Sequence, residues 1–471
     1  MANDVVFTPI RQLSKMVRTR QVSPLELTEV FLDRLDKLGP KYNAIVTVTH
    51  ELARTQARVA SLETTHVDGD RNLLHGIPWG AKDLLATSRG IPTTWGAAPF
   101  RAQTFDHDAT VVRKLAEAGA VLGAKLAMIE LAGGMGYRQP HATFTGPPRN
   151  PWDRDRWTGG SSAGSGAAVA AGLVPFAIGS ETWGSILSPA NNCGLAGLRP
   201  TYGRVSRHGA MALCWTLDKL GPLCLTADDC GIVLEAIAGP DPDDPTTYEL
   251  PFVYDAAETP NRRFKIGVLS DATVGAEPAV QDNFEKALAA LGDIVDVEEV
   301  EFPDLPYTAI TRTILMVESA AAFEDFIEEG KASGLTAPED HYGPYARTSV
   351  LATDYVKALR LRGVMAREVD AAMSGYDAIA APTSGSVASP ITEEFRSSVP
   401  SKPDIMGAAG NGCGLPSISV PSGFDEDGLP TGIQFMGRPY TENTILAIAR
   451  AYQSITDWHM RHPNDVGGVP G

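Results

Sequence analysis

Residues 159–199 constrain the fold more than any other stretch, because they place two glycine- and serine-rich turns on either side of a compact apolar segment. Ser161 follows a Gly-Gly pair in the first turn, and Ser185 follows Trp183-Gly184 in the second. Between them, residues 167–171 are rich in good helix formers. Residues 173–178 form a short apolar run typical of a buried strand. A helix followed by a returning strand can bring the two serine turns into contact.

The rest of the chain alternates between strand and helix patterns, which predicts an α/β fold. Predicted strands cover residues 264–269, 294–300 and 376–383, and predicted helices cover 108–118, 280–291, 310–329, 355–373 and 444–454. Residues 415–421 and 432–436 are predicted to form a hairpin-like pair, so we expect a mixed sheet. Near the N-terminus, Ser23 and Glu26 form a capping box, and the following helix is expected to end at Gly39-Pro40.

Composition restricts the class of partner. The chain has 471 residues, 43% of them hydrophobic, and a formal net charge of −17, which argues against binding to nucleic acid or to anionic membranes. The start of the chain shows no signal peptide, and no apolar run reaches membrane-spanning length. The 5 cysteines lack paired CxxC spacing, so we expect reduced thiols, a cytoplasmic protein and no metal site. A small neutral molecule is the expected ligand.

Several kinds of site could use the turn at residues 159–164. A phosphate-binding loop would need G-x-x-x-x-G-K-[ST], which the chain lacks. Ser162 lies at the centre of a G-x-S-x-G match, but a nucleophile elbow needs a buried strand before it, and the charged residues 153–156 precede this one. Glycine and serine are also common in tight turns that have no chemical role.

A further possibility combines both serines with Lys82, which lies among apolar residues and glycines. Taken alone, Lys82 is more simply a surface lysine with a buried stem. Burial would lower its pKa and let the neutral amine act as a base for a serine nucleophile, directly or through a second hydroxyl. Backbone N–H groups of residues 182–185 could then stabilise an oxyanion, and the glycine-rich loop around Gly134 could line the pocket.

The chain resembles the amidase signature family along nearly its whole length. The shared residues are Gly76-Ile77-Pro78, Lys82-Asp83, Gly159-Gly160-Ser161-Ser162, Gly184-Ser185-Ile186, Pro189-Ala190, and the stretches 194–200, 203–206, 414–421 and 432–434. The resemblance implies one domain over residues 1–471, with a large mixed sheet wrapped by helices on both faces. Within it we expect a helical scaffold over 1–70, a catalytic core over 71–240 and a substrate-covering region within 300–385.

The resemblance also implies a Ser–cis-Ser–Lys catalytic set. Ser185 corresponds to the nucleophile, Ser161 to the bridging serine and Lys82 to the base. Thr182, Trp183, Gly184 and Gly134 are the candidate oxyanion and substrate-binding residues. The implied reaction is hydrolysis of an amide C–N bond through an acyl-enzyme, with no metal or organic cofactor.

Three residues depart from the family pattern around the nucleophile. Glu181 stands where the family usually has Asp, Trp183 where it has Gly, and Leu187 where it has Arg. These departures favour a free-standing hydrolase of a neutral amide, anilide or aryl carbamate, with esters also possible. The alternatives are a glutaminase-type component of a tRNA-dependent amidotransferase and a non-catalytic binding protein. A homodimer is compatible with the sequence.

Overall fold

The fold is seen in a computed structural model that describes residues 5–66, 71–136, 138–256, 263–394, 404–464 and 466. Its strands are β1 (Ile45–Val48), β2 (Pro78–Lys82), β3 (Val121–Leu126), β4 (Phe176–Glu181), β5 (Ala196–Arg199), β6 (Lys219–Cys224), β7 (Phe264–Leu269), β8 (Val295–Val300), β9 (Ala378–Pro382), β10 (Ser417–Phe424) and β11 (Pro430–Met436). Its α-helices are α1 (Ile10–Arg18), α2 (Pro24–Tyr42), α3 (His50–His66), α4 (Thr110–Glu117), α5 (Ala163–Ala170), α6 (Leu187–Cys193), α7 (Ala227–Ile237), α8 (Pro278–Gly292), α9 (Tyr307–Ala322), α10 (Glu324–Glu328), α11 (Gly343–Arg347), α12 (Ala352–Met373), α13 (Gly410–Gly412) and α14 (Glu442–Ser454).

In the described residues, 11 strands form one mixed sheet in the order β1-β3-β2-β4-β6-β5-β10-β11-β9-β7-β8. Strand β2 lies between β3 and β4 and is parallel to both, whereas β4 is antiparallel to β6. Strands β10 and β11 form the predicted hairpin. The mixed α/β sheet expected from the sequence is therefore confirmed.

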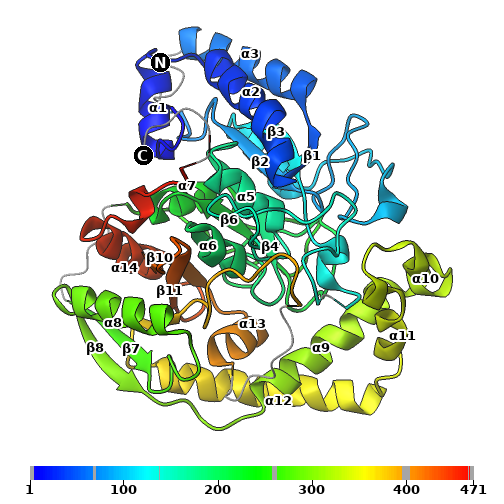
Figure 1. Ribbon diagram of the computed structural model, residues 1–471, viewed down its shortest axis with the longest axis vertical. Helices are drawn as coiled ribbons and strands as arrows, with labels where there is room; N and C mark the ends of the chain where they lie inside the picture. The colour runs from blue at the N-terminus through cyan, green and yellow to red at the C-terminus, as the bar shows by residue number, and fades with distance from the viewer. Residues whose placement is uncertain are drawn as a thin grey trace.

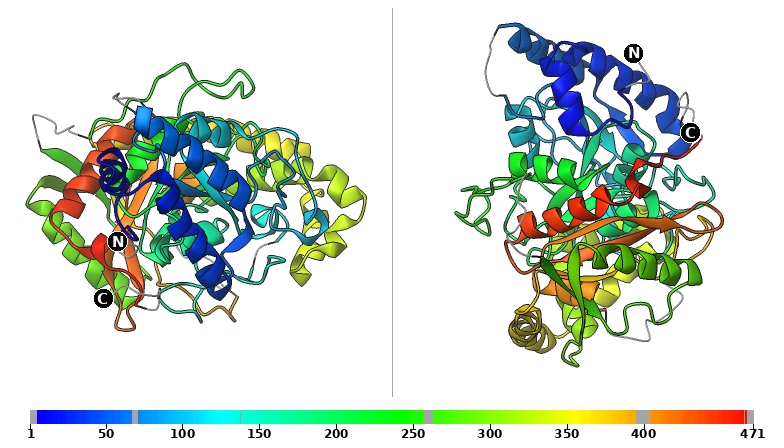
Figure 2. Two further views of the ribbon diagram at one scale, coloured as in Figure 1. Left: turned by 90° about the horizontal axis from the view of Figure 1, so that it is seen from above. Right: turned by 90° about the vertical axis from the view of Figure 1, so that its left-hand side faces the viewer.

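Helices cover the sheet on both faces. One core cluster joins residues of α1, α4, α7, α8 and α14 to the sheet, and a second joins residues of α2, α3, α5 and α6. A third cluster lies between α9, α12 and the strand ends near β9. Figure 1 shows α2 and α3 at one end of the molecule and α9 and α12 at the other, and Figure 2 shows the same separation. No helix in the described ranges is both long and apolar enough to cross a membrane.

Three local predictions were wrong. The single helix expected over residues 310–329 is interrupted at Phe323, which separates α9 from α10. Helix α2 does not stop at Gly39-Pro40 but continues to Tyr42, where the left-handed Asn43 (φ 48°) ends it. Tyr42 is fully buried, so its packing offsets the backbone hydrogen bond that Pro40 cannot make. The strand expected over residues 173–178 forms three residues later, as β4. This shift places Ser180 and Glu181 at the end of a central strand.

Candidate active site

Lys82 is the last residue of β2 and is completely buried beside β4. Its amine Nζ lies 2.8 Å from Ser161 Oγ, 3.0 Å from Ser162 Oγ and 2.9 Å from Ser180 Oγ. Lys82 is therefore not a surface lysine with a solvated amine. Three hydroxyl groups and the carbonyl oxygen of Ser180, at 3.5 Å, surround the nitrogen instead.

Burial lowers the pKa of Lys82 from its ordinary value to about 7, although the carboxyl groups of Asp218 and Glu181 act in the opposite direction. Removing an ammonium from water disfavours the charged form. Near neutral pH, a large fraction of Lys82 is therefore a neutral amine, which has the free lone pair that a proton acceptor needs.

The two serine turns meet as the sequence suggested. The peptide bond between Gly160 and Ser161 is cis, and the Ser161 carbonyl accepts a hydrogen bond from Ile129 N at 3.1 Å. Ser162 N donates to the Ser185 carbonyl oxygen at 3.3 Å, which joins the first turn to the second. Ser161 is fully buried and Ser185 is 7% exposed. Two of the three hydroxyls that contact the Lys82 amine, those of Ser161 and Ser162, thus belong to the turn that is hydrogen-bonded to the Ser185 turn.

Residues 182–185 directly follow β4. Within the described part of the chain, their backbone N–H groups have no hydrogen-bond acceptor. Gly184 has φ +84°, and a Cβ atom placed there would meet no atom within 4 Å. A positive φ is accessible to glycine at little cost. The turn therefore presents unpaired donors beside open space, which is the arrangement that stabilises a developing oxyanion.

The Glu181 side chain fixes the position of this turn through hydrogen bonds. Its Oε2 accepts hydrogen bonds from Ile186 N at 2.9 Å and Leu187 N at 3.0 Å, and its Oε1 pairs with Arg199 Nη1 at 2.9 Å. Burial raises the pKa of Glu181, but the charges of Arg199 and Lys219 more than offset this effect and leave it below its ordinary value. A buried, ionised carboxylate thus fixes the backbone on the C-terminal side of Ser185.

We expect Glu181→Gln to destabilise the fold by about 3–5 kcal/mol, because it leaves the Arg199 guanidinium buried without its counter-charge. Urea unfolding followed by circular dichroism measures the change. Asp33→Asn is the matched control, since it breaks an exposed pair with Lys37 at 2.6 Å and should cost less than about 1 kcal/mol. Equal stability losses in the two variants would contradict the structural role of Glu181.

Trp183 forms one wall of a cavity of about 620 Å³ that begins beside Gly184. Its indole Nε1 donates to Asp404 Oδ2 at 2.9 Å, and the other carboxylate oxygen of Asp404 accepts a hydrogen bond from Gly407 N at 2.7 Å. The indole is therefore fixed in place two residues before Ser185. A cavity of this volume is within the range of small-molecule sites.

Gly134, which the sequence also suggested as an oxyanion or substrate-binding residue, lacks the open space that lies beside Gly184. A Cβ atom at this position would lie 2.8 Å from Leu213 and 3.0 Å from Phe323, so the residue is closely packed. Its neighbour Ala132 and its contact Leu213 line a second, smaller cavity of about 190 Å³ beside Ser180. The predicted loop thus lies beside the smaller cavity, and the Gly134 N–H donates to the Leu131 carbonyl oxygen at 2.9 Å.

Three contacts of this site were not predicted from the sequence, namely those of Ser162 and Ser180 with the amine and that of Asp404 with the indole. A correct strand register would have indicated Ser180, because β2 and β4 are adjacent and parallel. Asp404 carries no such signal, since it is far from Trp183 in sequence.

Comparison with known proteins identifies the family. The model for the family described as Amidase matches residues 26–446. The chain belongs to the amidase signature family. It is 37% identical to a glutamyl-tRNA(Gln) amidotransferase chain of Roseiflexus castenholzii, over 97% of this chain and 98% of that protein.

Among solved structures, the native peptide amidase from Stenotrophomonas maltophilia matches with a TM-score of 0.83 and 28% identity, over 98% of this chain and 99% of the other. The corresponding glutamyl-tRNA(Gln) amidotransferase chain from Thermotoga maritima matches with a TM-score of 0.78 and 30% identity, over 95% of each chain. As a member of the amidase signature family, the protein is an enzyme that hydrolyses amide C–N bonds.

Proposed function

We propose that this enzyme hydrolyses its substrate through an acyl-enzyme on Ser185, with Ser161 as the proton relay and Lys82 as the base. The observation that carries the proposal is the fully buried Lys82 amine, 2.8 Å from Ser161 Oγ, with a pKa of about 7. A serine hydroxyl is a weak nucleophile until a base takes its proton.

In the acylation step, the Ser185 hydroxyl attacks the amide carbonyl carbon as its proton passes to Ser161, whose own proton passes to Lys82. Backbone N–H groups of residues 182–185 stabilise the oxyanion. The C–N bond then breaks, and the leaving amine takes the proton back from Lys82 along the same path. Water attacks the acyl-enzyme and gives a proton to Lys82, which returns it to the Ser185 oxygen as the acyl C–O bond breaks. The carboxylic acid so formed passes its own proton to Lys82 and leaves as a carboxylate.

Two substrate classes remain. The first is a simple neutral amide, anilide or carbamate cleaved by the single chain, which the likeness to peptide amidase supports. The second is glutamine, hydrolysed by one component of a tRNA-dependent amidotransferase. The sequence relatives support this second class more strongly, since those at 36–37% identity over at least 97% of this chain are named as chains of such an enzyme. In such an assembly, tRNA would be a partner of the complex, and the acidic charge of this chain argues only against binding by the chain alone.

Turnover by the purified single chain separates the two classes. A free-standing hydrolase should cleave a chromogenic anilide, an aryl carbamate or a peptide amide without any other protein. A glutaminase-type chain should release ammonia from glutamine and leave the anilide intact. Whichever activity is observed, Ser185→Ala should abolish it if the activity belongs to this site. Activity that survives the substitution would refute the proposal.

We also propose that Trp183 limits the size of the acyl group. Trp183→Gly should raise kcat/KM for bulky acyl groups relative to acetyl by about tenfold or more, because it removes the indole from the cavity beside Gly184. Trp183→Phe separates bulk from the hydrogen bond to Asp404, and Trp458→Phe is a remote control. An unchanged acyl-size profile in Trp183→Gly would reject this role.

A further inference from the structure

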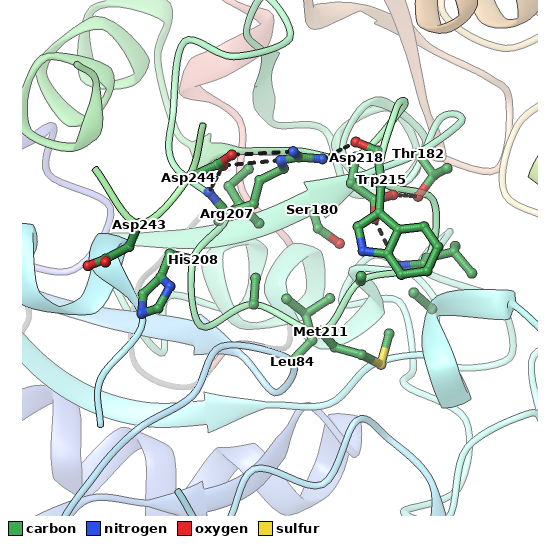
Figure 3. A pocket seen from close by; sticks show the side chains of 15 residues that line it. Leu84, Ser180, Thr182, Arg207, His208, Met211, Trp215, Asp218, Asp243 and Asp244 are labelled. Atoms are coloured by element: carbon green, nitrogen blue, oxygen red, sulfur yellow. Dashed lines mark hydrogen bonds and ion pairs between the residues drawn. The ribbon is translucent and has the colours of Figure 1, made fainter. Parts of the chain in front are cut away.

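The smaller cavity, of about 190 Å³, is lined by Ser180 and Thr182, whereas the larger one is lined by Trp183 and Gly184. Its walls combine apolar side chains with polar ones such as Asp218. Figure 3 shows Ser180 among the lining residues, with Arg207 and Asp244 paired nearby. The cavity is smaller than the roughly 300–1,000 Å³ of most small-molecule pockets, but it has room for water.

The three hydroxyls around Lys82 are not equivalent. Ser162 Oγ donates to the Ser180 carbonyl oxygen at 3.2 Å and accepts from Ser180 N at 3.3 Å, so its own proton is committed to the backbone. Ser161 Oγ is the proposed relay between Lys82 and Ser185. Ser180 Oγ has Lys82 as its one partner within the described ranges, and its side chain lines the cavity. Ser180 is thus the hydroxyl that connects the buried amine to this cavity.

The proposed reaction requires such a connection. When water has cleaved the acyl-enzyme, the product leaves as a carboxylate and its proton stays on Lys82. The amine is 0% exposed, and the product lies on the route through Ser161 and Ser185. Lys82 must nevertheless lose this proton before it can act as a base again.

We propose that Ser180 transfers this proton from Lys82 to water in the small cavity, so that the cavity is a proton exit separate from the acyl site. The Lys82 ammonium gives one proton to Ser180 Oγ while the Ser180 hydroxyl gives its own proton to the adjacent water. The products are a neutral amine, an intact serine hydroxyl and a hydronium that buffer removes. The inference rests on the proposed function of Ser185 and Lys82.

The wall of the small cavity carries charged side chains near the proposed proton path. Asp218 is buried at its wall, accepts a hydrogen bond from Thr182 Oγ1 at 2.5 Å and acts on Lys82 as a negative charge. Arg207, on the same wall, has its charge balanced by Asp244 at 3.3 Å.

Burst kinetics with 4-nitrophenyl acetate test the inference. Nitrophenolate leaves as an anion and takes no proton, so Lys82 is still protonated after acylation of Ser185. Deacylation cannot begin until Lys82 has released this proton. In Ser180→Ala, we expect the nitrophenolate burst to persist within twofold of the wild type and the steady-state rate to fall about tenfold or more. Ser180→Thr keeps the hydroxyl and should restore the rate, and imidazole at high concentration should partly rescue the alanine variant.

A second variant reduces the volume of the cavity. Ala212→Leu fills the space without touching Lys82, and we expect the same unchanged burst with a slower steady state. Equal losses of burst and steady state in both variants, or an unchanged steady state in both, would overturn the inference. A burst that survives Ser185→Ala would instead overturn the proposed function and this inference with it.

Discussion

Replacing Ser185 with alanine is expected to lower turnover by about 10⁴-fold or more, because no other hydroxyl takes the place of a missing nucleophile. The backbone of the turn should stay in place, since Glu181 holds Ile186 N and Leu187 N independently of the Ser185 side chain. Substrate binding should therefore survive. Steady-state kinetics, with binding measured by calorimetry, separate the two effects.

Ser165→Ala is the matched control, because this serine is also buried but lies in α5 with its hydroxyl 3.5 Å from the Ile178 carbonyl oxygen. Its turnover should stay within a few-fold of the wild type. A Ser185→Ala protein that retains more than a small fraction of wild-type turnover would contradict the assignment of the nucleophile.

Replacing Lys82 with methionine is expected to have two opposite effects, the first of them on activity. At pH 7, turnover should fall by about 10²–10⁴-fold, as for the loss of a general base. The wild-type rate should itself decrease about tenfold per pH unit below the Lys82 pKa of about 7, because protonation removes the lone pair. The pH–rate profile of the variant should lose this inflection.

The second effect of Lys82→Met is on stability. The pKa of Lys82 is about 7 in the folded protein, whereas an unfolded chain has a lysine pKa of about 10.4. Between these values the unfolded state binds the extra proton, so the stability contributed at this position rises with pH. At pH 7 and below, the buried amine costs about 4–5 kcal/mol. Because the variant loses hydrogen bonds to three hydroxyls, we expect a net gain of about 1–3 kcal/mol.

Urea unfolding at pH 6.5 and pH 9.5 measures this effect. The gain from Lys82→Met should be largest at the lower pH and should shrink as the pH rises. Lys37→Met is the control, since this lysine side chain is 71% exposed and should show no comparable pH dependence. A destabilised Lys82→Met protein whose deficit is constant across this range would contradict the lowered pKa.

Much of the fold could be predicted from local sequence. The apolar pattern of residues 264–269 gave the bounds of β7, and the hairpin of β10 and β11 followed from two short apolar runs. The end of α2 was predicted too early because the local preference of Pro40 is to end a helix, whereas the burial of Tyr42 favours its continuation. Strand order could not be predicted, because the pairing of β4 with β6 depends on contacts between residues that are far apart in the sequence.

The site could be predicted only in part. Motifs led to the prediction of Lys82, Ser161 and Ser185 as site residues, and the structure brings the segments that carry them together. Ser180 was missed because β4 was placed three residues too early. The partner of Glu181 was also missed, since Arg199 lies in a separate strand and Leu187, where the family has Arg, cannot form an ion pair. The Trp183–Asp404 contact joins segments whose proximity only the tertiary fold creates.

The most direct measurement is the rate at which a fluorophosphonate probe labels Ser185, followed against pH by intact mass spectrometry with peptide mapping. We predict a label on Ser185, a labelling rate that rises through an inflection near pH 7, and loss of that inflection in Lys82→Met. Labelling of another residue, or a pH profile that Lys82→Met leaves unchanged, would contradict the pairing of a neutral lysine with this serine.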